Sequence, residues 1–183
     1  MKCNRNLPVV LTVFYTSIGF YVCARMEAIM TKIECPNHSP EIVQNLSCHL
    51  HKKSPSSGSK SYSADFSLRN DANDIRGVYV FSFKQGSAII NYTASEMDYC
   101  QALAALHSHF LYKMIADELR RVSNFPLQCP FKMNKRYFIN EFTINSKLIP
   151  SYAPEMSFTS DCNIYIKKRR AIQLTIHGRV VRR

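Results

Sequence analysis

The sequence predicts a mainly β fold, an immunoglobulin-like β-sandwich with one amphipathic helix inserted at about residues 98–122. Residues 62–68 alternate between apolar and polar side chains, which is the period of a half-buried strand. A pair of apolar runs precedes residues 98–122 and another pair follows them. In each pair a short turn joins the two runs. Several short strands around a single helix favour a sandwich over alternating βαβ units.

Strands are expected on the amino-terminal side of the helix. Tyr62–Leu68 places Tyr62, Ala64, Phe66 and Leu68 on one face and serines with Asp65 on the other. Val78–Phe83 is apolar at nearly every position and is followed, after Gln85-Gly86, by Ala88–Thr93. A glycine between two apolar runs is typical of a hairpin, so we expect these two segments to pair.

The segment from Asp98 to Val122 changes to a helical period. Its apolar positions form one stripe: Leu103, Leu106, Phe110, Leu111, Met114, Ile115, Leu119 and Val122. Ser95 stands three residues before Asp98, as in a capping box, and Arg120 and Arg121 lie where the helix dipole favours cations. Pro126 then ends the pattern, so the sequence predicts both ends of the helix.

Further strands are expected after the helix. In Lys135–Ile144 we place Phe138, Phe142 and Ile144 on one face, with Tyr137 and Ile139 opposite. Ile164 and Ile166 then meet Ile172, Leu174 and Ile176 across the turn Lys167–Arg170, which predicts a second hairpin with a basic tip.

The amino terminus reads as a secretory signal peptide over residues 1–24. Lys2 and Arg5 precede an uncharged apolar run that ends in Val22-Cys23-Ala24, so we expect cleavage after Ala24 and a single domain over residues 25–183. An uncleaved membrane anchor is the alternative, since about eighteen apolar residues is the lower limit for a span. The expected location is extracellular.

Cysteines and sequons agree with secretion. Removing residues 1–24 leaves Cys35, Cys48, Cys100, Cys129 and Cys162. None forms a C-x-x-C pair and no Cys/His spacing matches a zinc site, so we expect two disulfides, one leftover thiol and no metal. The sequons are at Asn37, Asn45 and Asn91, with Pro40 making the first a poor acceptor.

The sequence argues against an enzyme. Its 183 residues include only 5 Gly, and no glycine-rich loop is present to cradle a nucleotide phosphate. The six histidines are scattered, no G-x-S-x-G motif occurs, and Asp98, Asp117 and Glu118 fit capping and solvated positions of the helix. We therefore predict no catalytic residues and no cofactor.

The order of landmarks resembles a known family. Asp98-Tyr99-Cys100 opens the helix, Cys129-Pro130 follows it, and the loop Leu148–Pro154 bears two prolines. This pattern, with Cys35 and Cys48 upstream, is similar to the insect family of secreted proteins termed domain of unknown function 1091. The resemblance implies a sandwich of the lipid-recognition (ML) type, a superfamily to which the chemosensory CheB proteins of flies and the ganglioside activator protein also look related.

The same resemblance implies the disulfide pairs Cys35–Cys48 and Cys100–Cys129. Cys162 departs from the family pattern. Three alternatives stay open for Cys162: a free thiol, an intermolecular disulfide, or a disulfide with Cys35 or Cys48.

A surplus of apolar side chains suggests a ligand cavity. The amphipathic helix and the loop 148–156 bring more large side chains than two sheets need, and in ML-type proteins the sheets splay. The expected lining is Tyr79, Phe81, Phe83, Phe110, Met114, Phe138 and Phe142, with Leu148, Ile149, Tyr152 and Met156 at the mouth. The alternative is that these residues pack on one another as an ordinary core.

We therefore expect a secreted protein that binds or carries a lipid or hydrocarbon, with a chemosensory role among those that the resemblance implies. The alternative is an extracellular accessory protein that binds a receptor or channel ectodomain without a lipid. The net charge is +11, and the turn Lys167, Lys168, Arg169 and Arg170 could contact a receptor or an anionic membrane. A secreted protein rarely meets nucleic acid, so that partner is not expected.

Overall fold

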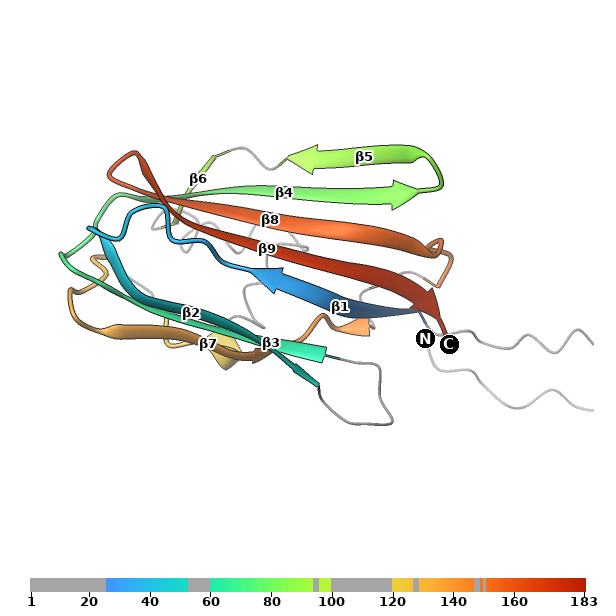
Figure 1. Ribbon diagram of the computed structural model, residues 1–183, viewed down its shortest axis with the longest axis horizontal. Coiled ribbons are helices and arrows are strands. Elements are labelled where there is room, and N and C mark those ends of the chain that lie inside the picture. Colours follow the sequence, from blue (N-terminus) through green and yellow to red (C-terminus); the bar gives the residue numbers. More distant parts are fainter. Residues whose placement is uncertain are drawn as a thin grey trace, which may run out of the picture.

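The computed structural model describes residues 26–52, 60–93, 96–99, 120–126, 129–146, 149 and 151–183, which form two facing antiparallel sheets (Figure 1). The strands are β1 (Met26–Glu34), β2 (Val43–Lys52), β3 (Lys60–Leu68), β4 (Ile75–Gln85), β5 (Ala88–Thr93), β6 (Met97–Asp98), β7 (Arg136–Phe142), β8 (Met156–Ile166) and β9 (Arg169–Arg182). The mainly β sandwich that the sequence predicts is therefore present.

The larger sheet has the strand order β1-β9-β8-β4-β5, with β6 paired to the start of β4. The smaller sheet has the order β2-β3-β7. Side chains alternate between the two faces of each strand, so every second residue points between the sheets. In β4 these inward positions are Ile75, Gly77, Tyr79, Phe81 and Phe83, because Ile75 lies in the core.

Three groups of buried side chains fill the interior along its length. The first joins Ile75, Ile166 and Ile172 of the large sheet to Val43, Leu68 and Tyr137 of the small one. The second lies around Tyr62, Met30 and Ile176. The third surrounds Phe158 near the start of β1 and the end of β9, with Met26 and Val180.

Four aromatic rings pack together in the first group, and two of them, Phe125 and Phe131, were not singled out by the sequence patterns. Tyr99, Phe125, Phe131 and Tyr137 contact one another with ring centroids 4.7–6.5 Å apart. Tyr137 is fully buried, and its hydroxyl accepts a hydrogen bond from the backbone N–H of Lys132 at 2.6 Å. These rings join the segments on both sides of residues 100–119 to the sheets.

Both predicted hairpins are confirmed. β4 pairs with β5 around Gly86, whose φ of 60° suits a tight turn. β8 pairs with β9 around Lys167 and Lys168 alone, because Arg169 already pairs with Ile166. The turn is thus two residues long rather than the four expected.

The sequence patterns missed β1 and β2. In β1 the buried positions are Met26, Ala28 and Met30, but a bulge between Met30 and Lys32 breaks the alternation. A second bulge in β2, between Gln44 and Ser47, includes Asn45 at a φ of 54°. Both strands carry many polar residues, since each lies at the edge of its sheet.

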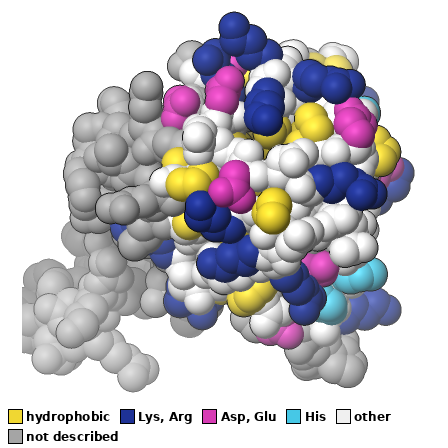
Figure 2. All heavy atoms as spheres, turned by 90° about the vertical axis from the view of Figure 1, so that its left-hand side faces the viewer, with side chains coloured by type: hydrophobic (Ala, Val, Ile, Leu, Met, Phe, Trp, Pro, Cys, Tyr) yellow, Lys and Arg dark blue, Asp and Glu magenta, His cyan; other side chains and the backbone are white. Residues whose placement is uncertain are grey.

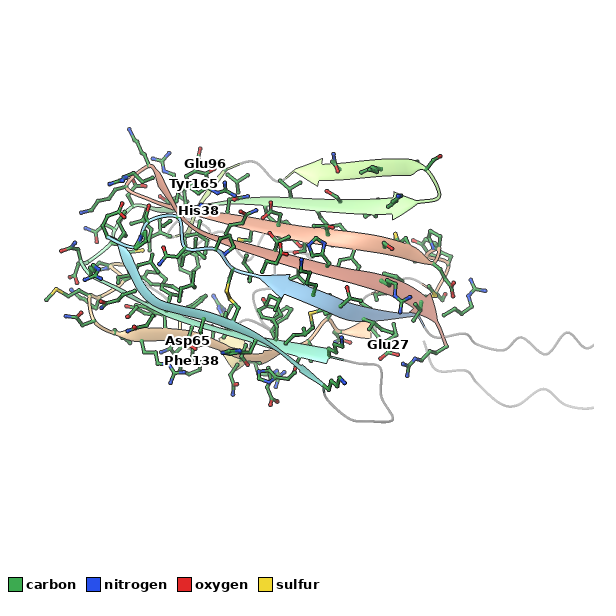
Figure 3. All side chains as sticks on the ribbon, in the orientation of Figure 1. Glu27, His38, Asp65, Glu96, Phe138 and Tyr165 are labelled. Atoms are coloured by element: carbon green, nitrogen blue, oxygen red, sulfur yellow. A yellow bond between two sulfur atoms is a disulfide. The ribbon has the colours of Figure 1, made fainter. Side chains whose placement is uncertain are left out.

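The predicted facing of β7 was wrong. Tyr137 and Ile139, expected on the side opposite Phe142, point into the core, and Phe138 points outward beside Asp65 (Figure 3). Phe142 still reaches the interior, where its ring packs 5.2 Å from that of Tyr62. Glu141 has a φ of 52° and the pairing of β3 with β7 shifts nearby, so a bulge reverses the side that later residues occupy.

Most of the predicted helix 98–122 lies outside the described residues. Asp98, expected to open it, pairs with Arg76 as part of β6, while Tyr99 and residues 120–122 are helical. Within the described part of the chain, no helix is both long and apolar enough to cross a membrane. The signal peptide expected at residues 1–24 also lies outside the described part.

One disulfide links the two sheets. Cys35, directly after β1, is bonded to Cys48 of β2, with their Cα atoms 6.2 Å apart. This pair confirms the first predicted bridge. Cys129 is also disulfide-bonded, but its predicted partner Cys100 lies outside the described residues. Cys162 on β8 is a free thiol, which excludes its alternative pairing with Cys35 or Cys48.

Candidate functional site

The inner face of β4 carries a row of three aromatic side chains. Tyr79 and Phe81 stack with centroids 6.5 Å apart, and Phe83 meets Phe81 edge-on at 5.5 Å. Phe81 also stacks on the buried ring of Phe158 at 5.5 Å. All three β4 rings remain only half-buried although they point inward. The interior is therefore less tightly closed along β4 than around Phe158.

Apolar residues from the segment after β7 and from the start of β8 join the buried group around Phe158. Ile144, Ile149 and Met156 pack with Phe81 on the group of buried residues around Phe158. Two of the expected mouth residues, Ile149 and Met156, thus pack on the same buried group as the β4 residue Phe81. Tyr152 does not, because its side chain is 86% exposed. Phe110, Met114 and Leu148 lie outside the described residues.

Polar atoms also lie between the sheets, beside Tyr79. The Ser160 hydroxyl donates a hydrogen bond of 3.0 Å to the Tyr79 hydroxyl, and Cys162 is the direct cross-strand neighbour of Tyr79. Burial raises the pKa of Tyr62 and of Tyr79, and it raises the pKa of the Cys162 thiol to about 11. All three groups are neutral at physiological pH, so they offer uncharged hydrogen-bonding partners.

A separate pocket of about 460 Å³ opens on the outer face of the small sheet. It is lined by Ser61, Arg121, Val122, Ser123, Phe138, Asn140, Glu141 and Thr143. Most of these side chains are polar, and Phe138 is the only aromatic one. Phe138 therefore lies on the opposite side of the small sheet from Phe142, and the two do not share a cavity.

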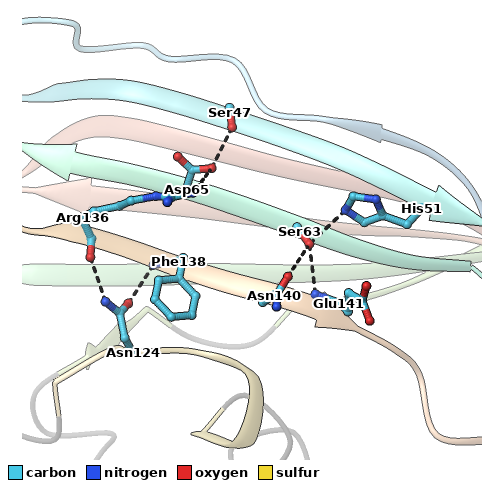
Figure 4. Close-up of polar contacts among 9 residues, drawn as sticks. All are labelled: Ser47, His51, Ser63, Asp65, Asn124, Arg136, Phe138, Asn140 and Glu141. Carbon is cyan, nitrogen blue, oxygen red and sulfur yellow. Dashed lines mark hydrogen bonds and ion pairs between the residues drawn. The ribbon is translucent and has the colours of Figure 1, made fainter.

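Polar contacts on this outer face bring a serine next to a histidine (Figure 4). The Ser63 hydroxyl lies 3.0 Å from Nε2 of His51 and accepts a hydrogen bond from the backbone N–H of Glu141. Nucleophilic catalysis also needs a third group to orient the base. In the described part of the chain, no recorded side-chain contact orients the second nitrogen of His51, and no cluster of residues suits a metal ion.

The end of the sandwich opposite the start of β1 and the end of β9 is rich in cations (Figure 2). Lys167 and Lys168 form the tip of the β8–β9 hairpin with φ of 51° and 64°. Arg169 pairs with Glu41 at 2.8 Å, and the carbonyl of Arg170 accepts a hydrogen bond from Ser39. All four basic side chains are exposed, on a turn that neighbouring loops hold in place.

The three sequons differ in their surroundings. The Asn37 amide is bonded on both sides, since it donates to the Val43 carbonyl at 2.9 Å and accepts from the Ser39 N–H at 3.1 Å. Asn45 and Asn91 are exposed, on β2 and β5. The fold thus leaves only the second and third sequons free to carry a glycan.

Comparisons with known proteins bear on the family. A comparison with curated proteins gave no match. Among solved structures, the chain is similar to a Niemann-Pick type C2 protein from the Japanese carpenter ant, with 11% identity and a TM-score of 0.31, covering 85% of this chain and 93% of that one. A family model described as "Protein of unknown function (DUF1091)" matches residues 77–160. This match runs from β4 into β8 and agrees with the resemblance that the sequence suggests: over these residues the chain is similar to the DUF1091 family.

Proposed function

We propose that the protein binds a small apolar ligand, a lipid or hydrocarbon, between its two sheets along β4. The observation that carries the proposal is the row Tyr79, Phe81 and Phe83, whose rings face the interior without being sealed by it. Aromatic side chains that face inward and remain partly accessible are typical of apolar ligand sites. The outer pocket around Phe138 is a weaker candidate for such a ligand, since polar side chains line most of it.

The energetics allow useful affinity. Burying a chain of about fourteen methylene groups yields about 11 kcal/mol at roughly 0.8 kcal/mol each. The cost of association reduces this value, and the remainder corresponds to micromolar binding or better. The neutral hydroxyls of Tyr62 and Tyr79 would then meet an uncharged part of the ligand.

Titration with a fluorescent long-chain probe, followed by displacement with unlabelled lipids, tests the proposal. We expect Phe81→Ala to weaken probe binding about 10- to 50-fold, from the loss of one aromatic contact surface. Phe138→Ala is the matched control, because it removes the same side chain from the outer pocket. Weakening by Phe138→Ala alone would move the site to that pocket, and no probe binding by the wild type would end the proposal.

The biological setting forms part of the same proposal. We infer an extracellular, glycosylated, non-enzymatic protein that carries its ligand or presents it to a receptor, including a chemosensory one. Support comes from the disulfide Cys35–Cys48, which is typical of oxidising compartments, and from the exposed sequons Asn45 and Asn91. The contact between Ser63 and His51 has no catalytic role in this proposal.

The basic hairpin tip favours a second candidate function, an accessory protein that binds the acidic ectodomain of a receptor or channel. Lysine is a poor choice for a two-residue turn with positive φ, where Asn-Gly is preferred. Residues held in unfavourable backbone conformations often mark functional sites. Charge reversal by Lys167→Glu and Lys168→Glu should then abolish receptor binding, whereas reversal of Arg179 and Arg182 at the other end should not. Binding that survives the first pair of changes would rule this function out.

A further inference from the structure

β5 forms one free edge of the large sheet in the described part of the chain (Figure 1). Its residues Ala88–Thr93 include no charge, proline or glycine. Ile89 is 65% exposed and Ile90 is 45% exposed. A free edge with exposed apolar side chains and strong β propensity invites pairing with another strand, which makes β5 a hazard for self-association.

The other outer strands in the described part of the chain have visible protection. The short strand β6 includes the charged residue Asp98. β1 has a bulge and the charged residues Glu27, Lys32 and Glu34. β2 has a bulge of its own and ends in His51 and Lys52. Charges and bulges both discourage edge-to-edge pairing.

At the β7 edge, the chain itself supplies a cover. Ser123 bridges to Ile139, and the Asn124 side chain donates to the Arg136 carbonyl at 2.8 Å and accepts from the Phe138 N–H at 2.8 Å. Among the described residues, β5 is thus the edge without a charge, a bulge or a covering segment.

β5 does carry a sequon in its centre. Asn91 is exposed, and Thr93 completes the acceptor sequence. Asn91 pairs with Ser82 and Ile89 pairs with Lys84, so Asn91 and Ile89 point to the same outer face of the sheet, two residues apart. A glycan on Asn91 would lie directly beside the more exposed isoleucine.

We propose that an N-linked glycan on Asn91 shields the β5 edge and keeps the protein monomeric. Without it, two copies associate through their β5 strands. The glycan on Asn45 has no such effect, because β2 is already protected by its bulge. This role is independent of ligand binding and requires only passage through the secretory pathway.

Single-site variants secreted from insect cells test the proposal, with mass measured by light scattering after gel filtration. We expect Asn91→Gln and Thr93→Ala, which remove the same sequon, to elute at twice the monomer mass or more. Asn45→Gln, the matched control, should remain monomeric. Adding Ile89→Lys to Asn91→Gln should restore the monomer, because a charge on the edge strand opposes pairing.

A second measurement covers variants that fail to be secreted. Wild-type protein made with high-mannose glycans is trimmed in its folded state to single sugars by endoglycosidase H, and association should follow. Peptide mass spectrometry establishes occupancy of Asn91. An unoccupied Asn91 in a monomeric wild type, or a monomeric Asn91→Gln at high concentration, overturns the proposal. A wild type that dimerises with Asn91 glycosylated also overturns it.

Discussion

Gly178 of β9 is a position where adding one methyl group should disrupt the interior. It lies directly opposite Phe158 on β8, on the face that points between the sheets. A Cβ at this position would lie 2.5 Å from Cε1 of Phe158 and 2.8 Å from the carbonyl oxygen of Ile29. Ordinary van der Waals contacts of a Cβ are 3.4–4 Å, so both neighbours would have to move.

Neither neighbour moves easily. The Phe158 ring is 4% exposed and stacks against Phe81, and the Ile29 carbonyl belongs to the backbone of β1. Overpacking a dense core costs typically 1–3 kcal/mol. Since one of the contacts is with backbone, we expect Gly178→Ala to cost about 3 kcal/mol in the free energy of unfolding.

Urea unfolding with disulfides intact measures this cost. With a slope of about 2 kcal/mol per molar urea, the midpoint should fall by about 1.5 M. Adding Phe158→Leu should relieve part of the clash, so the double variant should be more stable than the sum of the two single changes by about 1 kcal/mol. A midpoint unchanged in Gly178→Ala, or strict additivity, would refute the reasoning.

Three other predictions follow from the same structure. Replacing Lys167-Lys168 by Asn-Gly should raise the free energy of unfolding by about 1 kcal/mol, because Asn and Gly adopt positive φ at less cost than Lys. A lower melting temperature of this variant would contradict the prediction. The pKa of the Cys162 thiol is about 11 in the folded protein and 9.0 ordinarily. The contribution of the neutral thiol to the free energy of unfolding should therefore be complete below pH 9 and fall by about 2 kcal/mol as the pH rises towards 11. Denaturation midpoints of Cys162→Ala should show a shallower alkaline decline, and an identical decline would exclude this cause. Changing both Cys35 and Cys48 to serine should lower the free energy of unfolding by about 3 kcal/mol, because the disulfide closes a loop with a sequence separation of 13. Calorimetry that shows no loss of stability would contradict this prediction.

Much of the fold was predictable because local patterns and tertiary structure agree there. Tyr62–Leu68 forms most of β3, as its alternating sequence predicts, and Gly86 lies at the turn between β4 and β5. The bridge Cys35–Cys48 came from the family resemblance, since spacing alone left several pairings open. These features depend on a few neighbouring residues or on a shared pattern.

The errors arise where a bulge changes the face of a strand. One extra residue near Glu141 lets Phe138 and Phe142 point to opposite sides, although their spacing of four predicts one face. A serine hydroxyl on the neighbouring strand, that of Ser63, accepts the displaced N–H of Glu141, and only the assembled sheet reveals this contact. The candidate site consequently loses Phe138.

The candidate site also depends on long-range packing that no local pattern contains. The position of Phe81 over Phe158 depends on the pairing of β4 with β8, whose residues are far apart in the sequence. Tyr152 has the apolar, proline-rich surroundings expected of a cavity mouth, yet its side chain lies in solvent. Apolar composition predicted an interior, but not which residues would line it.

Nuclear Overhauser contacts between a saturating long-chain ligand and the aromatic rings test apolar ligand binding along β4 most directly. We predict cross-peaks from ligand methylene protons to the rings of Tyr79, Phe81 and Phe83, with none to Phe138 in the outer pocket. Cross-peaks to Phe138 alone, or none at all with ligand in excess, would contradict the proposed site between the sheets.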